Sequence, residues 1–204
     1  MRKMEFLTVF LILLASISSE GRGIAQTAAE QANQPNQYRL FATNKTSTMQ
    51  KEMNEAADSG FRFEGVMGGE TSLGGSEVVV IMGKPADAKA ESRYQYTLLA
   101  TSKTSTMQKE MQQAGDEGFE YRGQTVFDTS FGGQETVVIL ERDKSITTRP
   151  RHEYRLLATK KTSTMQKEVQ EAADQGFTFV GVTVSKTKFA GSEVVTIMRR
   201  VAAN

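Results

Sequence analysis

The octapeptide Lys-Thr-Ser-Thr-Met-Gln-Lys-Glu occurs three times in the 204-residue chain, and its first four side chains could bind an anion. A lysine and hydroxyl groups beside the free N–H groups of a helix N-terminus attract phosphate or carboxylate. The same residues could instead serve as a helix cap with one solvated lysine. Capping needs only one hydroxyl, so both interpretations stay open. The candidate anion-binding residues are Lys45, Thr46, Ser47, Thr48, Lys103, Thr104, Ser105, Thr106, Lys161, Thr162, Ser163 and Thr164.

Groups suited to catalysis are few. His152 is the only histidine and falls between two repeats, where we expect a solvated side chain, so no Ser–His pair or three-histidine metal site can recur in each copy. Recurring carboxylates could do acid–base work or bind calcium, but their positions favour a solvated structural role. They are Asp58, Asp116, Asp174, Glu77, Glu135 and Glu193. The residues therefore predict no catalytic centre, no metal and no cofactor, and an enzyme with an unusual carboxylate site is the rival.

Two sets of apolar residues also recur. Methionines at 49, 53, 107, 111 and 165 could suggest a soft-metal site, but Val169 occupies the sixth equivalent position, which favours packing. Leu73, Phe131 and Phe189 lie in predicted hairpin turns. These three residues either fold onto the core or form an exposed contact patch.

All these residues belong to a tandem repeat with a period of 58 residues, which places Tyr38, Tyr96 and Tyr154 at equivalent positions. The copies span residues 38–84, 96–142 and 154–200, joined by polar linkers at 85–95 and 143–153 and followed by a tail at 201–204. Three near-copies favour multivalent binding over a single asymmetric active site.

Each copy contains one helix between strands. Residues 38–43 alternate in polarity as a strand does. Ser47 and Gln50 have the spacing of a capping box, and the same pair recurs in the other copies. Met49, Met53, Ala56 and Ala57 then form one helical stripe. Glycine at 60, 118 and 176, each followed by phenylalanine, is typical of a left-handed helix end.

The remainder of each copy predicts a hairpin. Alternation resumes at Phe61, a glycine-rich turn is expected at 68–76, and an apolar strand follows at 77–82. That strand is apolar on both faces, so it belongs in the centre of a sheet. The predicted class is α+β: three β-α-β-β repeats, each a three-stranded antiparallel sheet in the order second–third–first with one helix on one face. The other face needs a cover. We expect a neighbouring copy there, around a pseudo-threefold axis or sheet to sheet, and a second chain is the alternative.

The middle copy resembles a family of small bacterial strand–helix–strand–strand domains of unknown function. The matching residues are Tyr96, the stretch Gly118-Phe119-Glu120 and the stretch Ile139-Leu140-Glu141-Arg142. The family usually has tryptophan after the glycine, whereas this chain has phenylalanine in all three copies. The resemblance implies a fold and no particular activity.

The N-terminus predicts export. Two basic residues precede an apolar run at 6–15, which is too short to span a bilayer, and a small-residue site follows at 23–25. Residues 1–25 are therefore predicted to be a signal peptide, with an uncleaved anchor as the alternative, and 26–37 a flexible leader. The protein would be periplasmic or extracellular, with no stable membrane span after cleavage. The absence of cysteine leaves packing alone to hold it together.

Charge limits the choice of partners. Loss of the signal removes three of 25 basic and two of 24 acidic residues, which leaves a net charge of zero. A neutral chain lacks the basic excess of a general nucleic-acid binder. We therefore expect a non-catalytic binding or scaffold protein whose partner is a protein or a small anionic ligand.

Overall fold

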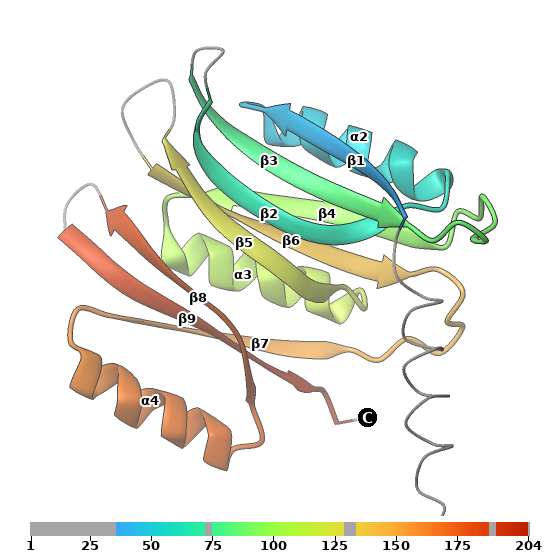
Figure 1. Ribbon diagram of the computed structural model, residues 1–204. Coiled ribbons are helices and arrows are strands. Elements are labelled where there is room, and N and C mark those ends of the chain that lie inside the picture. Colours follow the sequence, from blue (N-terminus) through green and yellow to red (C-terminus); the bar gives the residue numbers. More distant parts are fainter. Residues whose placement is uncertain (1–35, 72–74, 129–133, 188–190, 204) are drawn as a thin grey trace, which may run out of the picture. The chain divides into compact units, whose positions relative to one another are not determined.

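Three β-α-β-β repeats follow one another along the chain in the computed structural model, which describes residues 36–71, 75–128, 134–187 and 191–203 (Figure 1). Repeat 1 comprises β1 (Gln37–Thr43), α2 (Thr46–Asp58), β2 (Arg62–Thr71) and β3 (Gly75–Lys84). Repeat 2 comprises β4 (Tyr94–Thr101), α3 (Thr104–Asp116), β5 (Glu120–Asp128) and β6 (Gln134–Asp143). Repeat 3 comprises β7 (His152–Thr159), α4 (Thr162–Asp174), β8 (Thr178–Thr187) and β9 (Gly191–Val201).

Each repeat forms its own three-stranded antiparallel sheet. The strand orders are β1-β3-β2, β4-β6-β5 and β7-β9-β8, so the predicted central position of the closing strand is confirmed. Register is the same in every copy: Tyr38 lies opposite Gly83 and Tyr96 opposite Glu141. An irregularity in the second strand, between Phe63 and Gly65 in repeat 1, also recurs. The valines of the closing strand explain its central place in the sheet, because a strand with a neighbour on each side is shielded from water.

The helices follow the predicted stripe and stop. Met49, Met53, Ala56 and Ala57 are fully buried, and Val80 of β3 belongs to the same core. Each helix ends before a glycine with positive φ, 88° at Gly60, 82° at Gly118 and 83° at Gly176, where other residues are strained. The phenylalanine after each glycine is buried, so the helix end is fixed by an aromatic contact as well as by backbone geometry.

Several local predictions are wrong. Lys45 is the residue ahead of α2, and among the described residues no side chain caps this helix, so Ser47 and Gln50 form no capping box. Gln50 instead bonds to another repeat, as described below. The predicted turn at 68–76 is shorter, because β2 extends to Thr71 and β3 starts at Gly75. His152 is not a solvated linker residue: it opens β7 and is buried.

Two predictions fall on other parts of the chain. The signal peptide at 1–25 and the patch Leu73, Phe131 and Phe189 lie outside the described residues. Within the ranges that the structure describes, none of the helices has the length and apolar character needed to cross a bilayer.

Candidate functional site

The repeated Lys-Thr-Ser-Thr residues lie at the start of each helix. Lys45, Lys103 and Lys161 immediately precede the helices, and the hydroxyl residues form the first turn. The backbone N–H of Lys45 donates to Thr43 Oγ1 at 3.1 Å, and the same bond recurs in the other copies. Whether these ends bind an anion stays a prediction.

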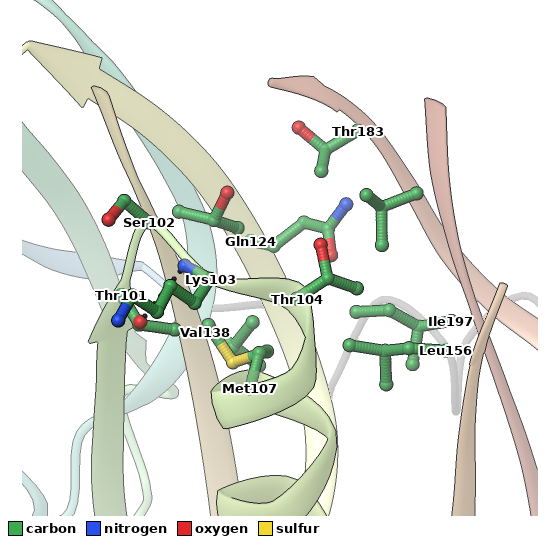
Figure 2. Close-up of a pocket in the computed structure, with 12 residues that line it drawn as sticks. Thr101, Ser102, Lys103, Thr104, Met107, Gln124, Val138, Leu156, Thr183 and Ile197 are labelled. Atoms are coloured by element: carbon green, nitrogen blue, oxygen red, sulfur yellow. Dashed lines mark hydrogen bonds between the residues drawn. The ribbon is translucent and has the colours of Figure 1, made fainter. Parts of the chain in front are cut away.

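A small pocket adjoins one of these ends, at α3. Lys103, Thr104 and Met107 line it together with Gln124 of β5 and Ile197 of β9 (Figure 2). Both amide atoms of Gln124 are buried without a hydrogen-bond partner among the described residues. The cavity measures about 20 Å³, which suits one water molecule and not a phosphate ion. The pocket therefore gives no support to a phosphate site at this helix end.

A more extensive polar constellation connects successive repeats, and its central members are helix amides. Asn54 of α2 accepts a bond from the backbone N–H of Tyr96 at 2.9 Å and donates to the carbonyl of the same residue at 3.0 Å. One turn earlier, Gln50 accepts from the N–H of Leu98 at 2.8 Å. These groups belong to β4, the edge strand of sheet β4-β6-β5. The two amides thus pair with a strand edge that would otherwise lack partners.

The same device recurs between repeats 2 and 3. Gln112 accepts from the N–H of Tyr154 at 3.0 Å and donates to the carbonyl of His152 at 3.2 Å. Gln108 accepts from the N–H of Leu156 at 2.7 Å and donates to the carbonyl of Tyr154 at 2.8 Å. We call this set of helix-amide-to-strand-edge bonds the amide clamp.

Tyrosine side chains extend the clamp on its apolar side. Tyr96 is 1% exposed and shares a core cluster with Met49 and Met53 of α2, while Tyr154 is 4% exposed beside Met107 of α3. Their hydroxyls accept bonds from backbone N–H groups of the preceding repeat: Phe63 to Tyr96 at 2.9 Å, and the equivalent bond to Tyr154 at 2.7 Å. Each tyrosine therefore occupies the preceding repeat with both its ring and its hydroxyl.

An aromatic side chain of each upstream repeat lies over a glycine of the next. A Cβ atom added to Gly123 would come within 3.0 Å of the Phe63 ring, and one added to Gly181 would collide with the Tyr121 hydroxyl. The glycines are required for this close approach, because any side chain would occupy the space of the ring.

Glu141 is the centre of a buried ionic network at the first junction. Its carboxylate accepts bonds from the Tyr96 hydroxyl at 2.7 Å, from Arg62 at 2.8 Å and from Arg122 at 2.6 Å. Burial opposes its ionisation, but these bonds and the two positive charges outweigh burial and hold the pKa of Glu141 below its ordinary value. Burial and the adjoining carboxylate raise the pKa of Tyr96, so its phenol stays protonated and is no nucleophile near neutral pH.

The second junction reverses these charges at the same positions. Arg62 of repeat 1 pairs with Glu141 of repeat 2, whereas Glu120 of repeat 2 pairs with Arg199 of repeat 3. Positions 62 and 120, like positions 141 and 199, are 58 residues apart. A given upstream repeat thus matches only one downstream repeat, because the other pairing would bring like charges together.

A polar cavity of about 170 Å³ lies beside this network. Arg62, Arg93, Arg122, Asp143 and His152 are among its lining residues. Its cations are largely neutralised: Arg93 pairs with Asp143 at 2.7 Å, and the other two pair with Glu141. Burial, with the nearby charge of Arg199, lowers the pKa of His152, which is therefore neutral near pH 7. The ion pairs at Glu141 and Asp143 give this arrangement a structural role, and Tyr96 offers it no ionised nucleophile.

Neither a protein-family model, nor a curated protein, nor a solved structure matches this chain. The amide clamp and its associated side chains are consequently interpreted from geometry alone. No cluster of three metal-binding side chains occurs among the described residues.

The sequence interpretation missed the amide clamp. The spacing of Ser47 and Gln50 predicts a cap, and no local pattern singles out Asn54. A usable signal was present: the amide recurs at 54, 112 and 170 although Asn and Gln differ in length. The charge reversal at 62 and 120 is likewise visible in the aligned copies.

Proposed function

We propose that the protein is an exported, non-catalytic binding or scaffold protein whose three repeats act as one stacked unit. Support comes from the amide clamp, which joins α2 to β4 and α3 to β7 with the same residue positions. A cluster containing Met53 of α2 and Ile139 of β6 adds a shared apolar core. A neighbouring repeat would in this way supply the cover that the second face of each sheet needs.

One observation carries the binding function: the exposure of Tyr38. Its equivalents Tyr96 and Tyr154 are 1% and 4% exposed, but Tyr38 is 61% exposed. Leu40 is 65% exposed on the same strand, and Ile81 and Met67 are exposed on the same sheet. We call Tyr38, Leu40, Met67 and Ile81 the head surface. The equivalent surfaces of repeats 2 and 3 are buried by contacts with the preceding repeat. A contiguous apolar area of this kind is typical of an interaction site.

Export is part of the proposal and rests on the sequence of residues 1–25. N-terminal sequencing of the protein from its native cells tests it. A mature chain starting near residue 26 is the expected result, and retention of residues 6–15 in a membrane fraction would contradict it.

The binding proposal is tested by differential capture. Residues 26–204 are immobilised and exposed to native envelope extract beside two variants, Leu40→Glu in the head surface and Val201→Glu as a control. Val201 is exposed to a similar degree, 63%, but lies outside the head surface. Partners should be lost with Leu40→Glu and kept with Val201→Glu. Equal capture by all three proteins would exclude the head surface as the binding site.

A further inference from the structure

The last repeat carries an unused copy of the clamp. Gln166 and Gln170 of α4 are equivalent to the clamp residues of α2, and both are exposed. Among the described residues, the Gln170 amide donates to Asp174 of its own helix at 2.9 Å and has no bond to another repeat. Ala173 is exposed, although its equivalent Ala57 is fully buried. The helix therefore presents amides equivalent to those of α2 and α3, and within the ranges that the structure describes no strand edge bonds to them.

Strand β8 adds an unused aromatic group beside this helix. Phe179 is equivalent to Phe63, which lies over a glycine of the next repeat, but it is 57% exposed. Val182 is 53% exposed, whereas its equivalent Val66 packs against the core shared with repeat 2. We call Gln166, Gln170, Ala173, Phe179 and Val182 the tail surface.

The first repeat offers the matching receiver. Register shows that the N–H groups of Tyr38 and Leu40 face away from β3, as those of the clamped residues in β4 face away from β6. In the part of the chain that the structure describes, β1 pairs only with β3. Gly65 corresponds to Gly123, the seat of an aromatic ring, and a Cβ added to Gly65 would meet nothing within 4 Å.

We propose that the tail surface of one molecule docks on the head surface of a second copy, so that chains associate head to tail. Gln166 and Gln170 then bond to the outer edge of β1 at Leu40 and Tyr38, and Phe179 occupies the space over Gly65. Such a contact uses two different surfaces, so it leaves one of each free and continues into a ring or a filament. This inference rests on the proposed binding role of the head surface and names its partner.

The charges at the junction positions are compatible with docking of the tail surface on the head surface. The upstream positions of the ionic pair are Arg62, Glu120 and Thr178, and the downstream positions are Gly83, Glu141 and Arg199. Two of each are already paired with each other. The remaining combination, Thr178 with Gly83, carries no charge, so docking of tail on head would bring no like charges together at this pair of positions.

We prefer a second copy of this chain as the occupant of the head surface, because the chain itself contains the matching tail surface. An unrelated protein would need a helix with two amides one turn apart, an alanine or glycine beside them and an adjacent aromatic residue. The chain places this set against a strand edge twice, at α2 and α3, and presents it a third time at α4.

Sedimentation velocity of residues 26–204, from low micromolar to several hundred micromolar, tests the proposal with two single variants. Leu40→Glu disables the head and Phe179→Glu disables the tail, and both side chains are exposed, so each variant should fold. The unaltered protein should grow in mass with concentration. Each variant alone should associate at least about tenfold more weakly than the unaltered protein. An equimolar mixture of the two should form a dimer and stop there, because only one intact head meets one intact tail. Val201→Glu should behave as the unaltered protein.

Three outcomes would overturn the proposal. One is a monomer at every concentration. Another is association that survives Phe179→Glu, which would mean that heads bind heads. The third is a mixture of variants that stays monomeric. A monomeric protein that still loses its captured partners on Leu40→Glu would overturn self-association alone and leave the proposed binding function standing.

Discussion

Removal of the Asn54 side chain should destabilise the whole protein, although this residue lies on the surface of its own helix. In Asn54→Ala the N–H and carbonyl of Tyr96 lose their partners. A hydrogen bond contributes about 0.5–1.5 kcal/mol net, and an unpaired buried group costs about 1–3 kcal/mol. Because Tyr96 is buried, we expect the free energy of unfolding to fall by about 2–4 kcal/mol.

Urea unfolding followed by circular dichroism measures this loss, and Gln170→Ala is the matched control. Gln170 occupies the equivalent position of repeat 3, where it bonds only to Asp174, so its removal should change stability by no more than about 0.5 kcal/mol. The control is measured on dilute protein, where no second molecule is bound. Equal losses in the two variants would refute the assignment of Asn54 to a junction between repeats.

Other substitutions test the helix end, the small pocket and the ionic network. Gly118→Val should lower the free energy of unfolding by on the order of 1–2 kcal/mol or more, because φ is 82° and the added Cβ would lie 3.1 Å from Arg149 Cβ. The control is Gly176→Val, whose added Cβ would meet nothing within 4 Å. Thermal melting should show a smaller loss of stability for this control. Gln124→Val introduces the residue type of the other two repeats. It should raise the free energy of unfolding by about 1–3 kcal/mol, since two unpaired amide atoms disappear. No gain in the denaturant midpoint would mean that water satisfies the amide. The pKa of Glu141 is lowered from 4.5, so its stabilising contribution is complete above about pH 4.5 and is lost as pH falls through the folded-state pKa. Glu141→Gln should therefore be less stable than the natural protein at pH 7 and decline less steeply in acid, and parallel curves of unfolding free energy against pH would contradict this role.

Local patterns in the sequence were enough to predict the fold of each repeat. Alternation, the methionine stripe and the Gly-Phe pair depend on neighbours close in the chain, so Met49, Gly60 and their copies could be interpreted without a structure. The central place of the third strand followed from its apolar residues on both faces, such as Val79 and Val80. Local signals failed at the helix start, where Thr43 and not Ser47 supplies the hydroxyl that bonds the backbone.

The junctions could not be predicted from local patterns, because their hydrogen bonds join residues 33 or more positions apart. Exposed-looking amides such as Gln50 and Asn54 have no local pattern that separates a solvated side chain from one bonded to a distant strand. The same holds for His152, which is the first residue of β7 and whose carbonyl accepts a bond from Gln112 of the preceding repeat. Comparison between copies was the missing step, since both the recurring amides and the reversed charges are properties of the alignment of repeats.

The reversed ion pairs also bear on how many repeats the chain can have. Tandem copies that are nearly identical invite unequal recombination, which removes or adds whole units of 58 residues. Loss of repeat 2 would place Arg62 opposite Arg199, and a second repeat 2 would place Glu120 opposite Glu141. Either product would bring two like charges together at a junction between repeats and so destabilise that junction. The two ion pairs thereby act against change in copy number, and the gene can retain three units although its copies remain alike.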